Sequence, residues 1–179
     1  PNLLKDGRKM YAYHFEGYWK DVGTISSLWE ANMEVLDPEH SGINLFDENW
    51  KIYSRNSGMT GHKIGSNAVV ENCMITDGCR IDGNVKHSIL FSGVKVEKGA
   101  KIEDAVVMGG TVIKAGAVVE HCIVAENVVI GENAIVGSMP KDKEDGVATI
   151  GSGITIGKGA KIGPNAMVNK NVEDGEEQW

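Results

Sequence analysis

Three consecutive rows of equal length decide the fold of this chain: VKHSILFSGVKVEKGAK (85–101), IEDAVVMGGTVIKAGAV (102–118) and VEHCIVAENVVIGENAI (119–135). Aligned with their neighbours, they place large aliphatic residues in three columns. The first column holds Val70, Val85, Ile102, Val119 and Val136; the second holds Ile75, Leu90, Val107 and Val124; the third holds Ile64, Ile81, Val96, Ile113 and Ile130. Because residues two apart on a strand share a face, these positions and the alanines two places before them are predicted to point inward. Each row therefore predicts three short strands, which form one turn of a parallel solenoid.

Turn-forming residues mark the corners of this repeat. The residues just before the small inward alanines are Asn67, Gly99, Gly116 and Asn133, which are types that tolerate a positive φ. The pattern pauses over 137–149 and resumes at IGSGIT, so we expect a polar loop inserted there. A β-sandwich is the alternative, but sandwich strands recur every 8–12 residues and do not hold such columns.

The six-residue unit, an aliphatic residue often followed by Gly, Glu or Asp with a small residue in fifth place, resembles the hexapeptide-repeat family. The resemblance implies a left-handed parallel β-helix, a handedness that runs against the usual right-handed crossover. We therefore expect a mainly β fold, with a β-helix domain over 50–179.

Composition narrows the class of partner. The net charge of −7 and the lack of a basic patch argue against nucleic acid. No apolar stretch approaches the roughly 20 residues of a membrane span, and the N-terminus lacks the apolar core of a signal peptide. We expect a cytoplasmic protein.

The cysteines and two histidines fall into the same columns as the repeat. Cys73, Cys79 and Cys122 occupy inward small-residue positions and form no CxxC, so packed, reduced core thiols are expected rather than ligands. His87 and His121 share a column that lies between inward positions, so we expect solvated surface side chains.

Residues 1–49 follow a different pattern. Met10 to Glu16, MYAYHFE, alternate as a half-buried strand would, and Thr24 is a plausible N-cap for a helix that Asp37-Pro38 ends. Asp21 lies between the strand and the helix. Its carboxylate could reach a metal or substrate, or it could cap the helix together with Thr24, and spacing alone does not separate these interpretations.

The segments GYWKDVGT (17–24) and LWEANM (28–33) resemble the end of the catalytic domain of bacterial glucose-1-phosphate adenylyltransferase, the ADP-glucose pyrophosphorylase family. In that family a helix and linker lead into a C-terminal β-helix. The resemblance covers essentially the whole chain, but the chain covers less than half of such an enzyme. It implies that 1–49 is a short strand-helix remnant of an α/β nucleotidyltransferase domain together with a linker.

Carried over residue by residue, the resemblance makes Asp21 a catalytic residue, one of two aspartates that hold Mg²⁺, and Trp19 a wall of the sugar-phosphate pocket. Lys20 stands where the family usually has a basic residue, and it receives no role. The family makes ADP-glucose and pyrophosphate from ATP and glucose 1-phosphate for glycogen synthesis. Its β-helix serves a homo-oligomer, a tetramer, and the binding of sugar-phosphate or nucleotide effectors.

Two observations limit what this chain can do. It contains no Gly-rich nucleotide loop of the GGxGxRL type, and one carboxylate does not hold Mg²⁺ tightly, so the chain alone is predicted to be inactive. An anionic effector could approach basic residues of the repeat and the inserted loop, although solvated surface lysines are the expected interpretation. These residues are Lys95, Lys98, Lys101, Lys141 and Lys143.

Two other function classes remain open. A hexapeptide acyltransferase would place His87 or His121 at a trimer interface beside an acyl-CoA cleft, but it gives no place to GYWKDVGT. A catalytically inactive regulatory paralogue subunit would have a purely structural role, and the intact Asp21 weakly disfavours it.

Overall fold

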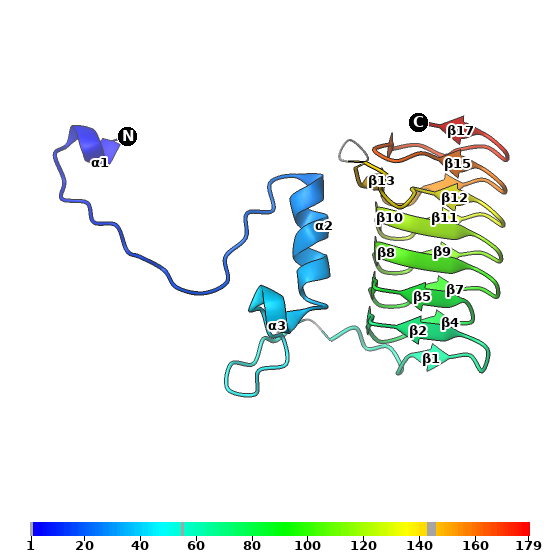
Figure 1. Ribbon diagram of the computed structural model, residues 1–179, viewed down its shortest axis with the longest axis horizontal. Helices are drawn as coiled ribbons and strands as arrows, with labels where there is room; N and C mark the ends of the chain where they lie inside the picture. The colour runs from blue at the N-terminus through cyan, green and yellow to red at the C-terminus, as the bar shows by residue number, and fades with distance from the viewer. Residues whose placement is uncertain (1, 55, 143–145) are drawn as a thin grey trace.

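The structure, a computed structural model, describes residues 2–54, 56–142 and 146–179. Short parallel strands stack as successive coils from β1 to β17, and three helices with extended connections precede them (Figure 1). The prediction of a mainly β chain is confirmed, and the parallel pairing is consistent with a left-handed β-helix. None of the helices in these described ranges is long and apolar enough to span a membrane.

One sheet forms the first face of the β-helix. Its strands, in spatial order, are β1 (Lys63–Ile64), β4 (Arg80–Ile81), β7 (Lys95–Val96), β9 (Val112–Ile113), β11 (Val129–Ile130) and β14 (Thr155–Ile156). From β4 onward, each strand contributes one exposed or half-exposed residue and one inward aliphatic residue.

The second sheet bends around a corner and supplies the other two faces, because its two longest strands, β8 (Lys101–Val107) and β10 (Val118–Val124), run through the bend. On one side of the bend lie β2 (Val69–Glu71), β5 (Asn84–Lys86), β12 (Ile135–Val136), β15 (Lys161–Ile162) and β17 (Glu177–Gln178). On the other side lie β3 (Met74–Ile75), β6 (Ile89–Leu90), β13 (Ala148–Ile150) and β16 (Met167–Val168).

The strand register confirms the three predicted columns. Ile81 pairs with Ile64 and Val96 in the third column, and Val107 pairs with Leu90 and Val124 in the second. From β4 onward these side chains are almost fully buried. Ile64 in the first coil is 45% exposed, because β1 is the edge strand of its sheet and no further coil of the described residues covers it. Stacking of neighbouring coils therefore creates the core.

The three thiols lie where the columns predicted. Cys79 and Cys122 are buried in the core of the β-helix and Cys73 is half-buried against it, and all three are free. Burial raises the pKa of Cys122 far above its ordinary value. The interpretation as core packing therefore holds best for the two fully buried residues.

Neighbouring coils differ in length. The coil that joins Ile81 to its partner Val96 is shorter than the next one, which joins Val96 to Ile113. The shorter coil contains Gly83, where a Cβ would lie 2.5 Å from the carbonyl oxygen of Ala100, so only glycine fits. Three of the four predicted corner residues, Gly99, Gly116 and Asn133, have a positive φ, but Asn67 does not.

The inserted loop ends earlier than its polar composition suggested. Ala148 and Thr149, which the pattern assigned to the loop, belong to β13 and pair with Cys122 and Ile123 of β10. The next residue of β10, Val124, pairs with Val107 on one side and with Ile150 on the other. The insertion therefore lengthens one coil at a corner and leaves the columns aligned.

Three helices precede the β-helix: α1 (Asn2–Lys5), α2 (Ile25–Glu34) and α3 (Pro38–Ser41). Thr24 caps α2 as predicted, because its Oγ1 accepts a hydrogen bond from the Ser27 amide at 3.1 Å. The strand expected at Met10 to Glu16 is wrong. These residues are exposed and form no strand, because no strand of the described chain lies beside them to pair with their backbone.

Candidate functional site

Helix α2 lies against the outside of the β-helix, where β6, β8 and β10 expose apolar residues. Ile89, Val106 and Ile123 alternate with inward residues and form a stripe across these three strands. Met33 of α2 is buried against this stripe, with Trp29 and Leu28 beside it. The helix is therefore packed onto the β-helix through a second hydrophobic cluster, separate from the core.

Trp29 fixes α2 at the bend between the second and third faces. Its indole Nε1 donates a hydrogen bond to the backbone oxygen of Asp104 at 2.7 Å. Its ring also meets His121 edge-on, with centroids 4.4 Å apart. His121, which we expected to be solvated, is only 9% exposed, and this burial lowers its pKa. The prediction of a surface side chain was wrong because a helix from elsewhere in the sequence covers it.

The shared column of these residues is a row of corners. Asn72, His87, Asp104 and His121 all have φ between 41° and 51°, the left-handed region, which turns the chain between two faces. His87 Nδ1 lies 2.5 Å from Asp104 Oδ1, so these two corners are also joined through their side chains. His87 is half-buried beside Asp104, so the expectation of a solvated surface side chain is met only in part.

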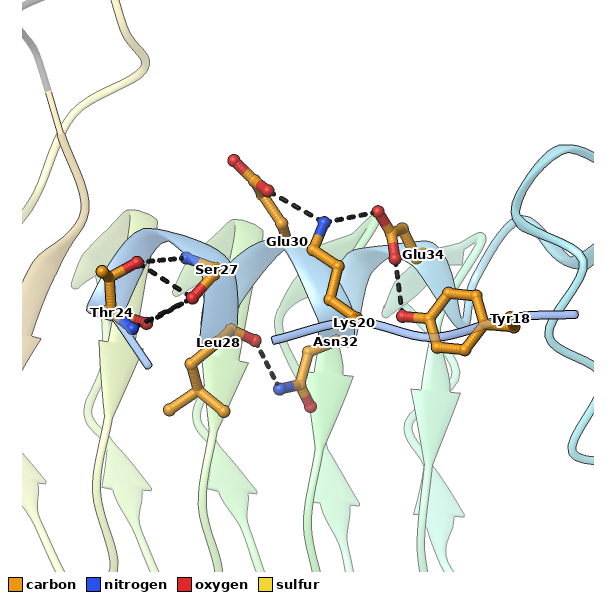
Figure 2. A network of polar contacts seen from close by, with 8 residues as sticks. All are labelled: Tyr18, Lys20, Thr24, Ser27, Leu28, Glu30, Asn32 and Glu34. Carbon is orange, nitrogen blue, oxygen red and sulfur yellow. Dashed lines mark hydrogen bonds and ion pairs between the residues drawn. The ribbon is translucent and has the colours of Figure 1, made fainter. Parts of the chain in front are cut away.

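The segment before α2 runs back along the helix and is tied to it by polar contacts (Figure 2). Lys20 Nζ donates to Glu30 Oε2 at 2.9 Å and to Glu34 Oε1 at 2.7 Å. Tyr18 Oη donates to the other oxygen of Glu34 at 2.6 Å. Two side chains of the segment therefore meet on one carboxylate of α2.

These contacts shift the protonation of all three partners. The hydrogen bond from Lys20 holds the pKa of the Glu34 carboxyl below its usual range, and the Tyr18 hydrogen bond acts in the same direction. Glu34 in turn raises the pKa of the Tyr18 phenol, and Glu34 and Glu30 raise the pKa of Lys20. The charged forms of Lys20 and Glu34 are therefore both favoured.

The two residues singled out by the sequence, Trp19 and Asp21, are both exposed. Trp19 is 75% exposed. Asp21 Oδ1 accepts a hydrogen bond from the Gly23 amide at 3.0 Å, and its Oδ2 has no hydrogen-bond partner in the described chain. Asp21 therefore does not cap α2, since Thr24 and Ser27 form that cap by themselves. The alternative of a capping aspartate was wrong.

Within the described ranges, no group of three or more His, Cys, Asp or Glu side chains could hold a metal ion. A hollow of about 530 Å³ opens between the end of α2 and the first coils, lined mainly by apolar residues that include Leu36, Phe46 and Met74. Neither Trp19 nor Asp21 lines it. The candidate site in this chain is thus a surface strip formed by residues 18–21, and not an enclosed pocket.

The lysines considered for an anion are on the surface. Lys95, Lys98, Lys101 and Lys141 are exposed, and Lys143 lies outside the described residues. Lys98 lines one shallow pocket and Lys101 lines another. The three lysines Lys95, Lys98 and Lys101 therefore do not share either of these pockets.

Two features of this region escaped the sequence analysis. The outer apolar stripe was visible in the runs SILF, AVVM and CIVA, in which every residue is apolar or small instead of alternating, as expected for strands buried on both faces. The pair Glu30 and Glu34, one helical turn apart, was also visible, but nothing in the sequence showed that Lys20 would lie between them.

Known proteins provide two family matches, in order along the chain. Residues 1–38 match the model described as "Nucleotidyl transferase". Residues 57–157, more than half of the chain, match the model described as "GlmU-like, C-terminal hexapeptide". The first match includes the segment with Trp19 and Asp21, and the second includes most of the β-helix.

Curated relatives carry the name glucose-1-phosphate adenylyltransferase. The proteins of Bacillus mycoides (strain KBAB4) and Bacillus cereus (strain ATCC 10987 / NRS 248) are each 57% identical to this chain over 99 residues. The matched part covers 55% of this chain and 26% of each relative. The extent of the hexapeptide match and the parallel β-helix together show that the chain belongs to the GlmU-like C-terminal hexapeptide family.

Proposed function

We propose that this chain is the C-terminal portion of a glucose-1-phosphate adenylyltransferase. That enzyme converts ATP and glucose 1-phosphate into ADP-glucose and pyrophosphate for glycogen synthesis. The observation that carries the proposal is the order of the two family matches together with relatives of that name at 57% identity. The proposed division places the end of the catalytic domain and a linker at 1–49 and the β-helix at 50–179.

In this proposal Asp21 is a ligand of the catalytic Mg²⁺ and Trp19 is a wall of the sugar-phosphate pocket. The Oδ2 of Asp21 and the exposed indole of Trp19 support these roles, because both groups are open to a domain packed against the strip. One carboxylate fits a shared metal site but not a complete one, since Mg²⁺ needs further carboxylates and substrate phosphates. When bound, the ion would neutralise charge that develops on the transferred phosphate.

The β-helix has no chemical role in this proposal. It is proposed to pack against the catalytic domain, to help build a cytoplasmic homo-oligomer such as a tetramer, and to form one side of a cleft for sugar-phosphate or nucleotide effectors. The coils from β4 to β16 offer a rigid surface for these contacts, because their inward side chains are almost fully buried.

The acyltransferase alternative receives little support from the geometry. His121 lies under Trp29, and His87 is paired with Asp104, so neither histidine lines an open acyl-CoA cleft. A regulatory paralogue remains the second candidate, because the same fold would serve it.

The experiment is a comparison of three purified proteins in an ADP-glucose synthesis assay with Mg²⁺. We expect no activity from the 179-residue chain, activity from the complete protein, and an activity loss of several orders of magnitude in Asp21→Asn of the complete protein. An inactive complete protein that folds and still binds an active partner subunit would support the regulatory paralogue. Synthesis by this chain alone would contradict the assignment of the missing machinery to another domain.

A further inference from the structure

We propose that Lys20 is a positioning residue, which with Tyr18 clamps the candidate catalytic strip to α2 so that Trp19 and Asp21 face the catalytic domain. This inference rests on the proposed function. It assigns a role to a residue that the sequence left without one.

The side chains of the strip point alternately toward α2 and away from it. In an extended segment successive side chains point to opposite sides. Tyr18 and Lys20 point to α2, where both reach Glu34 (Figure 2). Trp19, between them, is 75% exposed. Asp21 is exposed as well, as the alternation leads us to expect. Anchoring the even positions therefore presents the odd positions, and a slip of one residue would exchange the two sets.

The clamp consists of the contacts that Tyr18 and Lys20 make with two carboxylates of α2. Lys20 bridges two carboxylates, and Glu34 receives one donor on each oxygen. The side chain of Lys20 is only 23% exposed although it lies at the surface. These contacts join two positions of the strip to two positions of α2. They therefore fix where the strip lies along the helix axis and which of its sides faces the helix.

Helix α2 carries two acidic residues where Lys20 docks. Glu30 and Glu34 are one helical turn apart, and like charges at this spacing repel each other. Lys20 lies between them at 2.9 and 2.7 Å and balances the repulsion. When Lys20 is absent, the acidic pair favours neither the helix nor the docked strip.

The strip is connected to the β-helix through α2. Helix α2 is held by the Trp29 hydrogen bond to Asp104 and by burial of Met33. The strip is held in turn by Glu30 and Glu34 of the same helix. The position of Asp21 relative to the β-helix is therefore fixed by contacts through α2, and not by the linker alone.

The size of each effect separates positioning from stability. Ion pairs between partly exposed side chains add little to global stability. A misplacement of about 1 Å at reacting groups can reduce rate by about 100-fold. We therefore expect Lys20 to matter for catalysis far more than for melting.

The test uses the complete protein with Lys20→Met, Lys20→Arg and the matched control Lys86→Met, which removes another surface lysine paired with a glutamate, Glu103. We expect Lys20→Met to lower kcat/KM for glucose 1-phosphate by about 10- to 100-fold and to raise the Mg²⁺ concentration needed for half-maximal rate. Lys20→Arg should restore most of both, because guanidinium also reaches two carboxylates. All three variants should melt with the wild type.

A second measurement is independent of activity. In the 179-residue chain, nuclear Overhauser contacts between the Tyr18 ring and the Glu34 side chain are expected in the wild type, in Lys20→Arg and in Lys86→Met, and are expected to be lost in Lys20→Met. If the complete wild-type protein makes no ADP-glucose, the proposed function fails while these contacts still decide whether the clamp exists. If the wild type is active and Lys20→Met matches Lys86→Met in rate and Mg²⁺ requirement, the inference is overturned.

Discussion

Replacing Trp29 with alanine is expected to release α2 from the β-helix without melting the β-helix. A fully buried aromatic side chain removes about 150–250 Å² from water, worth roughly 4–6 kcal/mol at about 25 cal/mol per Å². Trp29 is partly buried, so about half of this is lost, together with about 1 kcal/mol for the hydrogen bond to the Asp104 oxygen. The expected total is about 3–4 kcal/mol. Helix α2 has 10 residues, too few for stability in isolation, so it has no reserve against this loss.

Hydrogen exchange of α2 amides and thermal melting of the β signal measure the two parts separately. In Trp29→Ala we expect the amides of α2 to lose protection while the main melting transition stays in place. Trp29→Phe keeps a ring but not the donor, and should weaken protection by only about 1 kcal/mol. Trp19→Ala is the matched control, because Trp19 is exposed and should leave α2 unchanged. Full protection of α2 in Trp29→Ala would refute the reasoning.

Three further predictions concern the core, a buried histidine and the thiols. Ile113→Asp should unfold the β-helix, because it removes about 1.5–3 kcal/mol of burial and adds an unpaired charge. Lys114→Asp, at the neighbouring exposed position, should leave the β-helix folded. Equal melting temperatures for these two variants would contradict the inward assignment of Ile113. His121 has a lowered pKa, so its folded form resists protonation: docking of α2 should be fully stable above about pH 6.5 and weaken as pH falls through the folded pKa. His121→Asn, which suits the positive φ, should flatten that dependence of α2 exchange on pH. Under native conditions iodoacetamide should label Cys73 before Cys79 and Cys122, as read by mass spectrometry, and equal rates would argue against their burial.

The columns of the β-helix could be predicted because each inward residue is repeated by its neighbours one coil away. Val107, for example, pairs with Leu90 and Val124, and all three are fully buried because each is covered by the next coil. Sequence spacing therefore reports spatial neighbours directly in a solenoid. The same logic failed for Met10 to Glu16, because alternation shows which face would be covered and not whether a partner strand is present.

The candidate site was predictable only in part. Thr24 identified the start of α2, since capping is a local interaction. The burial of His121 under Trp29 and the position of Lys20 against Glu34 depend on contacts between segments that are well separated in the sequence. No local pattern specifies such contacts. The nearest available signal was the apolar outer stripe at Ile89, Val106 and Ile123, which required a cover.

The insertion between β12 and β13 shows where this architecture accepts new sequence. It enters at the corner after Val136 and returns to the column at Ala148, so that every later pairing is kept. The entropy of closing a loop costs only about 0.6 kcal/mol more for each doubling of its length, so longer segments at this corner should fold almost as well. One residue added inside β10 would instead turn its inward side chains outward. The returning end also places Val147 in the same hydrophobic cluster as Met33 of α2, so loop exchange at this corner would remodel the surface beside the helix while the coils remain untouched.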